Sequence, residues 1–224
     1  TALGDKVTLA QSATGTGKYK VYSVYRGGLS INQDVNLDND GTGTKPLDDF
    51  YKVDFLSSTM LLEENQKITG TKDGQMAMFQ GNFDEGSEKG TLNDIIVTNK
   101  GSISLSGNSI TTAGNEKTTT AMAGDFATLT NQGKIEVTGN KGIGIFGAGG
   151  SKVLNDNGAS IKIGQEGVAL FGTNKLGAST LGDKKISLEN KGNITAVDGK
   201  KKTFGMYAHN DTSIFVIADS KITN

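Results

Sequence analysis

The chain alternates apolar and polar residues in short runs, and these runs recur along most of its length. The clearest unit is 131–147, N-Q-G-K-I-E-V-T-G-N-K-G-I-G-I-F-G, where two alternating runs are joined by a glycine turn. Copies of its two halves recur at 76–80, 99–105, 157–163, 168–172, 190–196 and 204–208. Alternation with a period of two predicts short strands that bury one face, so we expect a repeat protein made of strands.

The repeats have a loose period that is typical of solenoids. One isoleucine marks the phase, and Ile103, Ile135, Ile161, Ile194 and Ile222 are separated by 32, 26, 33 and 28 residues. Each repeat also contains a third short alternating run, as at 128–130, 185–188 and 213–216. Three short strands and tight turns form one coil of a parallel β-helix. We therefore predict an all-β, right-handed parallel β-helix of about seven coils, with Ile103, Ile135, Ile161 and Ile194 in one column.

The repeat is regular over 66–224 and less regular over 1–65. We interpret 1–65 as irregular first coils, or a cap, of the same helix whose regular coils occupy 66–224. Polar insertions interrupt the pattern at 38–49, 80–92, 106–119 and 173–183. Loops on a rigid scaffold carry recognition, so these insertions are the candidate contact regions.

Two sets of repeated polar or aromatic residues leave alternatives open. The turn asparagines Asn99, Asn131, Asn157 and Asn190 share one phase, which fits either a hydrogen-bonded amide ladder or simple turn propensity. The aromatic residues share another phase, at Phe79, Phe146, Phe171 and Tyr207. Pure alternation places these rings outside, whereas a bend after Ile145 turns them inward, and we favour a core stack because an exposed stripe is sticky.

Small residues separate the paired apolar residues of the second run. They are Ala77, Ala121, Gly144, Ala169 and Gly205. Their recurrence at one phase supports close stacking of successive coils.

Composition excludes several classes of function. The chain has 32 glycines, 1 proline and no cysteine, and its formal net charge is −1. The chain therefore has no excess positive charge to attract nucleic acid. Arg26 is the only arginine, so the chain also lacks the arginine side chains that form paired hydrogen bonds with bases. No apolar run is long enough for a membrane-spanning helix, and the first residues do not form a signal peptide. We expect the chain to be a processed or cut piece of a longer protein.

Two short motifs suggest ligands, but each has a plainer explanation. Gly142–Gly147 fits G-x-G-x-x-G, yet another strand follows where a dinucleotide-binding turn needs a helix. Residues 36–49 begin like a calcium loop, with Asn36, Asp38, Asp40 and Gly41, but Leu47 occupies the position of the bidentate glutamate. A solvated acidic turn is the favoured interpretation, and calcium is the alternative. No cofactor or metal site is assigned.

Catalytic residues are not predicted either. Glycoside hydrolysis needs two carboxyl groups close together, but the positions equivalent to Glu136 hold Ser104, Lys162 and Thr195. The lone histidine, His209, lies near Asp211 at a strand end, where an exposed turn histidine is the commoner explanation. We expect a protein that is not an enzyme.

The unit at 131–147, followed by G-Q-E-G-V-A-L-F-G at 164–172, resembles the passenger domains of type V autotransporters, especially the large fusobacterial outer-membrane adhesins. The resemblance covers about 66–224. It implies a right-handed β-helical stalk outside the bacterial cell, exported through a C-terminal barrel that this chain lacks. No binding residue is carried over, because family members bind through divergent loops.

The expected function is attachment to host cell-surface proteins or glycans, or to other bacterial surfaces, through the stalk and its loops. The location implied by the resemblance is the bacterial cell surface or outer membrane. A polysaccharide-degrading β-helix, such as a depolymerase or lyase, is the alternative, and a purely structural spacer is the third possibility.

Overall fold

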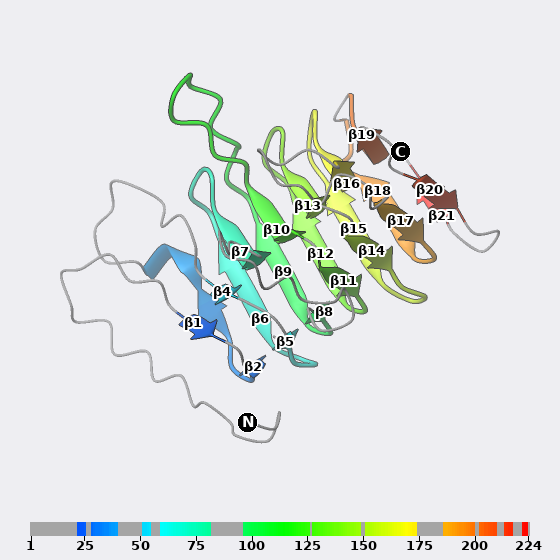
Figure 1. Cartoon of the computed structure of the whole chain (residues 1–224). Helices are drawn as coiled ribbons and strands as arrows, with labels where there is room; N and C mark the ends of the chain where they lie inside the picture. Colours follow the sequence, from blue (N-terminus) through cyan, green and yellow to red (C-terminus); the bar gives the residue numbers. More distant parts are fainter. Residues whose placement is uncertain are drawn as a thin grey trace.

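The computed structural model shows a stack of coils, each made of three short strands, running from the blue to the red end of the sequence (Figure 1). The structure describes residues 22–25, 28–39, 51–54, 59–81, 96–125, 127–148, 151–173, 186–199, 202–209, 213–216 and 221–223. Every strand in these ranges pairs in parallel with its equivalent in a neighbouring coil. The predicted all-β parallel β-helix is confirmed.

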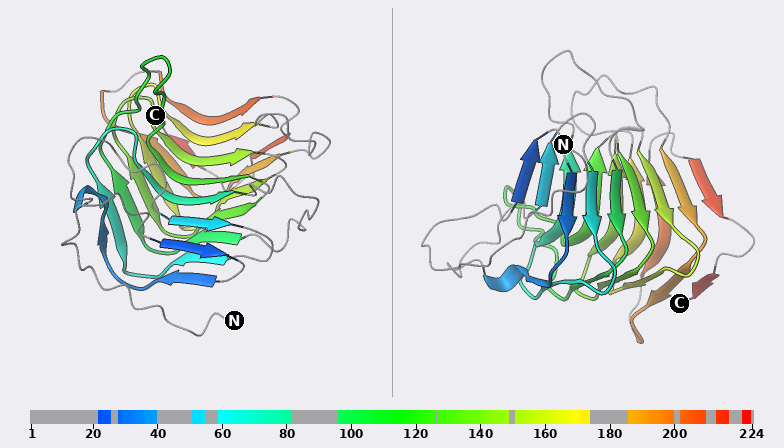
Figure 2. Two further views of the ribbon diagram at one scale, coloured as in Figure 1. Left: turned by 60° about the vertical axis from the view of Figure 1, so that its left-hand side comes forward. Right: turned by 90° about the horizontal axis from the view of Figure 1, so that it is seen from below.

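Three sheets of seven strands each run along the stack (Figure 2). The first sheet contains β1 (Tyr22–Tyr25), β4 (Tyr51–Asp54), β7 (Met76–Gly81), β10 (Thr120–Asp125), β13 (Ile143–Ala148), β16 (Val168–Thr173) and β19 (Phe204–His209). The second contains β2 (Gly28–Ile31), β5 (Thr59–Leu62), β8 (Ile96–Asn99), β11 (Thr128–Asn131), β14 (Lys152–Asn155), β17 (Ser187–Asn190) and β20 (Ser213–Val216). The third contains β3 (Val35–Asn36), β6 (Lys67–Gly70), β9 (Ser102–Leu105), β12 (Lys134–Val137), β15 (Ser160–Ile163), β18 (Asn193–Ala196) and β21 (Lys221–Thr223). A short 3-10 helix, η1 (Leu37–Asn39), follows β3.

The predicted isoleucine column is present in the third sheet. Ile135 of β12 is in register with Ile103 of β9 and Ile161 of β15, and Ile161 is in register with Ile194 of β18. These four side chains are at most 2% exposed. Burying one such side chain contributes about 1.5 to 3 kcal/mol, so the column is a main source of stability.

A second buried column, in the second sheet, is made of asparagines. Asn99 donates from Nδ2 to Oδ1 of Asn131 (2.7 Å), Asn131 donates to Asn155 (2.8 Å), and Asn155 donates to Asn190 (2.7 Å). All four side chains have no exposed surface. The second N–H of Asn131 reaches the carbonyl oxygen of Ser160 at 3.3 Å. The sequence pattern therefore reflects an amide ladder.

The prediction is wrong for one residue of the ladder. Asn155 occupies the position expected for Asn157, because Asn155 is in register with Asn131 and Asn190. Ile161 lies six positions after Asn155, whereas Ile135 lies four positions after Asn131. The two extra residues extend the turn, where Gly158 adopts φ +80°, and leave Asn157 exposed.

The small residues of the first sheet are confirmed as close-packing positions. Ala77, Ala121 and Ala169 have no exposed surface. A Cβ on Gly144 would lie 2.5 Å from the carbonyl oxygen of Ala169 and 2.9 Å from Cγ2 of Ile161. At Gly144 even alanine would require the next coil to move.

The predicted aromatic core stack is also wrong, because the rings lie on the outer side of the first sheet. A Cβ on Gly147 would point to the buried Val153, so its neighbour Phe146 points outward. Phe146 and Phe171 are partly exposed and Tyr207 is 43% exposed. The rings do stack, with centroids 5.2 Å and 5.3 Å apart. Alternation continues past Ile145 without the bend that would turn them inward.

The ladder predicts a large effect of a single truncation. Asn131→Ala leaves Nδ2 of Asn99 and Oδ1 of Asn155 buried without their ladder partner. We expect the free energy of unfolding to fall by about 2 to 4 kcal/mol, since each unsatisfied buried group costs about 1 to 3 kcal/mol. Urea unfolding followed by circular dichroism measures this change. The exposed Gln132→Ala is the matched control, and equal losses in both variants would contradict a stabilising ladder.

Candidate functional site

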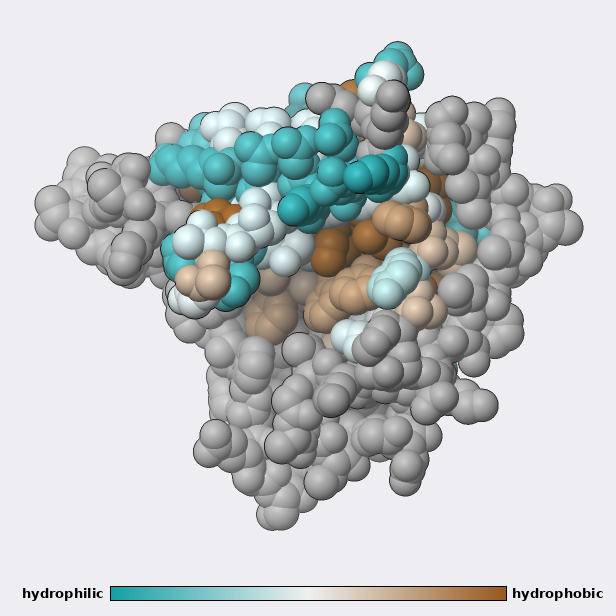
Figure 3. All heavy atoms as spheres, turned by 90° about the horizontal axis from the view of Figure 1, so that it is seen from above, coloured by the Kyte–Doolittle hydropathy of each residue, from teal (hydrophilic) through white to brown (hydrophobic). Residues whose placement is uncertain are grey.

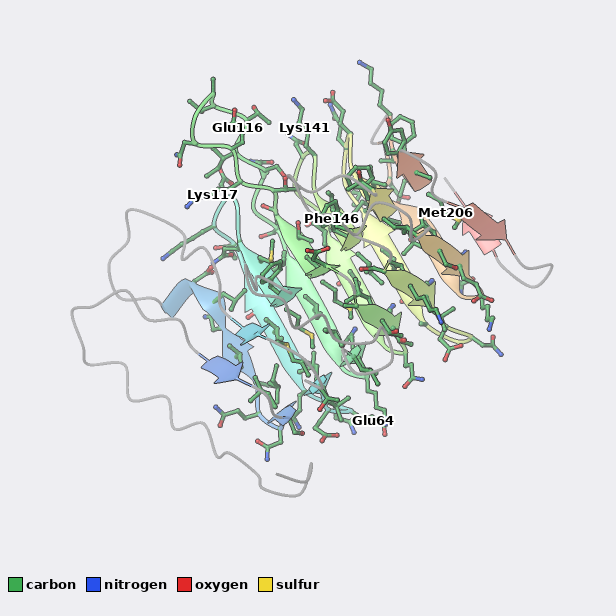
Figure 4. The ribbon with its side chains drawn as sticks, viewed as in Figure 1. Glu64, Glu116, Lys117, Lys141, Phe146 and Met206 are labelled. Atoms are coloured by element: carbon green, nitrogen blue, oxygen red, sulfur yellow. The ribbon has the colours of Figure 1, made fainter. Side chains whose placement is uncertain are left out.

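The insertion at 106–119 is the predicted contact region that lies within the described residues. It rises from the edge of the stack between β9 and β10, and Glu116 and Lys117 lie on it (Figure 4). Residues 111–116 are all exposed. The prediction from sequence located this element but gave it no structure.

The insertion is a β-hairpin with a defined turn. Ile110 and Lys117 form an antiparallel bridge in which each N–H donates to the other's carbonyl oxygen, at 2.7 Å and 3.0 Å. The N–H of Asn115 donates to the carbonyl oxygen of Thr112 at 2.9 Å, and Gly114 between them has φ +79°. Glycine at the third position is what a type II turn requires. The tip therefore has a hydrogen-bonded backbone of its own.

Two hydroxyl groups fasten the base of the hairpin. Oγ of Ser109 donates to the carbonyl oxygen of Lys141 at 2.7 Å, and Oγ of Ser109 also accepts the N–H of Thr119 at 3.0 Å. Thr119 is fully buried, and its Oγ1 donates to the carbonyl oxygen of Asn108 and accepts the N–H of Gly74, at 2.8 Å and 2.9 Å. The base is thus tied to the coil before it and to the coil after it.

Asn108 completes this attachment on both sides. Its N–H donates to Oδ1 of Asp73 at 2.7 Å, and its own Oδ1 accepts the N–H of Asn140 at 2.9 Å. The backbone carbonyl of Asn108 also accepts the N–H of Gly74 at 2.8 Å. The base of the hairpin is therefore held by the turn of the preceding coil and by the turn of the following coil.

The tip is polar and nearly neutral. Its exposed groups are the hydroxyls of Thr111 and Thr112, the amide of Asn115 and the carboxylate of Glu116, next to the ammonium of Lys117. These groups supply both hydrogen-bond donors and hydrogen-bond acceptors, some neutral and some charged. Such a surface suits recognition of a polar protein surface or a sugar by hydrogen bonds.

An apolar strip on the outer side of the first sheet accompanies the hairpin. Figure 3 shows brown and tan surface beside a teal band of polar residues. Partly exposed apolar residues at the outer positions of β13 and β16 form it with the two exposed aromatic residues of β19; they are Ile143, Phe146, Val168, Phe171, Phe204 and Tyr207. Phe204 is 51% exposed, and its ring lies 6.2 Å from that of Tyr207. This strip was not expected from the predicted core stack.

The other three predicted insertions lie largely outside the described residues. Residues 40–50, 82–95 and 174–185 are not described, so the regions 38–49, 80–92 and 173–183 stay predictions. Of the acidic motif at 36–49, the structure describes residues 36–39, and Asp38 is the acid among them. The rest of the calcium hypothesis, including Asp40 and Gly41, lies outside the described residues.

The carboxylate of Asp38 is already engaged by the next coil. It accepts the N–H of Thr71 (2.8 Å), the hydroxyl of Thr71 (2.7 Å) and the amide of Gln75 (3.0 Å). Partial burial acts to raise the pKa of Asp38, but these hydrogen bonds outweigh it and hold the pKa below its ordinary value. The described geometry therefore gives Asp38 a structural role that ties η1 to β6 and the turn after it.

The candidate catalytic residues are not brought together as paired carboxylates. Glu136 is in register with Ser104 and Lys162, as expected, and makes an ion pair with Lys134 at 3.1 Å. His209 ends β19, and Asp211 lies outside the described residues. Within the described ranges, no three histidine, aspartate or glutamate side chains gather as metal ligands would.

The glycine motif at Gly142–Gly147 is part of the repeat. Residues 143–148 form β13, and a Cβ on Gly142 would lie 2.3 Å from Cγ1 of Val137. The glycine is therefore needed where the turn passes close to the core. The strand confirms the expectation that no helix opens on this motif.

Asp125 is a buried acid that sequence reasoning missed. It ends β10 in register with Ala148 and is only 9% exposed. Among the described residues its Oδ1 has no hydrogen-bond partner, and burial raises its pKa. No repeat signal marks it, because the neighbouring coils hold unrelated residues at its position.

Comparisons of the sequence with protein-family models, with curated proteins and with solved structures gave no match. Among the residues that the structure describes, no helix is long and apolar enough to cross a membrane.

Asp125 predicts a gain of stability on truncation. Because the pKa of Asp125 is raised in the folded protein, Asp125 contributes most favourably to the free energy of unfolding below its pKa in the unfolded chain, which is about 3.9. This contribution declines as pH rises through the pKa of Asp125 in the folded protein. Asp125→Ala should therefore raise the free energy of unfolding at neutral pH by about 1 kcal/mol, and the gain should shrink as the solution is acidified. Thermal unfolding across pH measures this. Asp198→Ala, at an exposed position, is the control for loss of one charge.

Asp38 predicts the opposite dependence. Its lowered pKa gives stability that is present above the unfolded pKa of about 3.9 and is lost as pH falls through the folded pKa. Asp38→Asn should lower the free energy of unfolding at neutral pH by about 1 kcal/mol, because the Asp38 carboxylate is partly exposed and partly screened. The deficit should close in acid. A deficit that is constant with pH would show that the charge of Asp38 does not matter.

Proposed function

We propose that this protein is part of the passenger of a bacterial surface adhesin, a β-helical stalk that presents contact loops outside the cell. The partner is a host cell-surface protein or glycan, or the surface of another bacterium. The parallel β-helix supports this proposal because it is a rigid scaffold whose turns accept insertions without disturbing the stack.

The observation that carries the proposal is the hairpin at 106–119. Its base makes hydrogen bonds to the coils on both sides, whereas residues 111–116 are exposed. A hairpin that served only to connect β9 and β10 would not need this length, since the equivalent turn between β12 and β13 uses 138–142. A fixed tip also loses little conformational freedom when it binds.

The chemistry of the tip favours neutral or mixed-charge polar partners. The formal net charge of −1 gives no attraction to nucleic acid. The apolar strip on the first sheet offers a second contact surface, in which the ring of Phe171 lies 5.2 Å from that of Phe146 and 5.3 Å from that of Tyr207. Contact with apolar side chains of a protein partner suits this strip.

The proposal predicts that the tip, and not the stalk, decides attachment. Alanine at Thr111, Thr112 and Glu116 together should lower attachment of the displayed protein to cells by about tenfold, as loss of central contacts does elsewhere. The base, with Ser109 and Thr119, remains intact, so the circular dichroism spectrum should not change.

The matched control changes three exposed residues in the turns at the opposite edge, where Glu64 lies (Figure 4). Alanine at Glu64, Lys100 and Gln132 together should leave attachment unchanged. Equal attachment by both triple variants and the unaltered protein would rule out the hairpin as the contact site.

A further inference from the structure

The turn between β14 and β15 carries an asparagine–glycine pair that the proposed function does not use. Asn157 and Gly158 are adjacent, and both are exposed. They belong to the extended turn that follows the ladder residue Asn155. Gly158 has φ +80°, and no atom lies within 4 Å of where its Cβ would be.

The peptide N–H of Gly158 is the free amide of this turn. The N–H of Asn157 donates to Oδ1 of Asp156 at 2.8 Å, and the N–H of Ala159 donates to the carbonyl oxygen of Asp156 at 3.1 Å. Among the described residues, the N–H of Gly158 has no hydrogen-bond partner. It is therefore accessible to solvent base and unhindered by a side group.

We infer that Asn157 is a site of spontaneous covalent modification by its own backbone. The peptide nitrogen of Gly158 attacks Cγ of Asn157, and a new C–N bond forms as the bond between Cγ and Nδ2 breaks. Ammonia leaves with the proton of the peptide nitrogen. The product is a five-membered cyclic imide. Water then adds to one of its two carbonyl groups and opens the ring, which gives aspartate or isoaspartate.

The fold protects the four ladder asparagines from the same reaction. Their amide groups are fully buried, and those of Asn99, Asn131 and Asn155 donate along the ladder. Each is followed by a residue larger than glycine, at Lys100, Gln132, Asp156 and Lys191. The side chain of that following residue obstructs attack by the peptide nitrogen. Asn157 differs from the ladder asparagines because glycine follows it and because it is exposed.

The helix can tolerate the product. Ring opening adds one negative charge beside Asp156, and isoaspartate lengthens the backbone by one methylene. Both changes fall in the turn, which already holds two residues more than the equivalent turn after Asn131. Asn155 remains held by Asn131 and Asn190. Folded protein should therefore accumulate charged forms without losing its ladder.

As a test, the folded 224-residue chain and a synthetic peptide of residues 151–163 are incubated side by side in mildly alkaline buffer. Incubation continues until half of the peptide has been converted, and peptide mapping by mass spectrometry then measures each asparagine. Asn157 in the folded protein should be converted at a rate within about tenfold of the peptide, which corresponds to about 1.4 kcal/mol in the barrier. The four ladder asparagines should stay unconverted. A folded protein in which Asn157 survives as well as they do overturns the proposal.

Two variants test the route through Gly158. Gly158→Asp keeps a residue type that tolerates positive φ, and the open space around Gly158 accepts the added carboxylate group. Conversion of Asn157 in Gly158→Asp should be at least about tenfold slower than in the unaltered protein. In Asn157→Gln, loss of ammonia from the glutamine at position 157 should be slower by at least the same factor. Unchanged circular dichroism shows that both variants fold. Conversion of Asn157 at the unaltered rate in Gly158→Asp would exclude the backbone nitrogen as the attacking group.

Discussion

The structure depends on parallel, in-register hydrogen bonding between successive coils. The N–H of Lys134 donates to the carbonyl oxygen of Gly101 at 2.9 Å, and Ser160 repeats this bond to Gly133 at 3.0 Å one coil later. Paired strands lie about 4.8 Å apart, so every residue in a strand rests on its equivalent in the next coil. Each column of equivalent residues must therefore pack against itself, and any buried polar group must find its hydrogen-bond partner within or beside its own column.

This constraint explains why polar residues can be buried in some columns and not in others. An asparagine inside the helix is satisfied when the coils above and below also carry asparagine, as Asn131 shows. Where Leu62 takes the position before Asn99, Oδ1 of Asn99 has no partner among the described residues. Asp125 has no acidic or amide counterpart at its position in β13, which is Ala148. A lone polar residue in a stack thus costs stability that a repeated one does not.

The same constraint decides how much could be predicted from sequence. The isoleucine column was predictable because Ile103, Ile135 and Ile161 each occupy the same position within a short strand motif. Changes in the length of the turns do not alter that position. The ladder was misassigned at Asn157 because the turn after Asn155 is longer, and spacing alone cannot say on which side of an asparagine an insertion falls. The direction of Phe146 depends on whether the strand bends, which no residue type in that run specifies. The anchors of the hairpin, Ser109 and Thr119, could not be found because they act across turns of different lengths.

Since the columns fix every residue inside the stack, variation is confined to the turns, and each turn is limited by the coils on either side of it. The hairpin at 106–119 meets this limit by fastening its base to both neighbouring turns, through Asn108 and Ser109. The longer turn at Asn157 meets it by adopting positive φ at Gly158, which leaves an amide without a backbone partner among the described residues. The first solution gives a rigid projection that can bind, and the second gives a reactive peptide bond. The proposed contact site and the proposed modification site therefore have one origin, which is the way a regular stack accommodates extra residues in its turns.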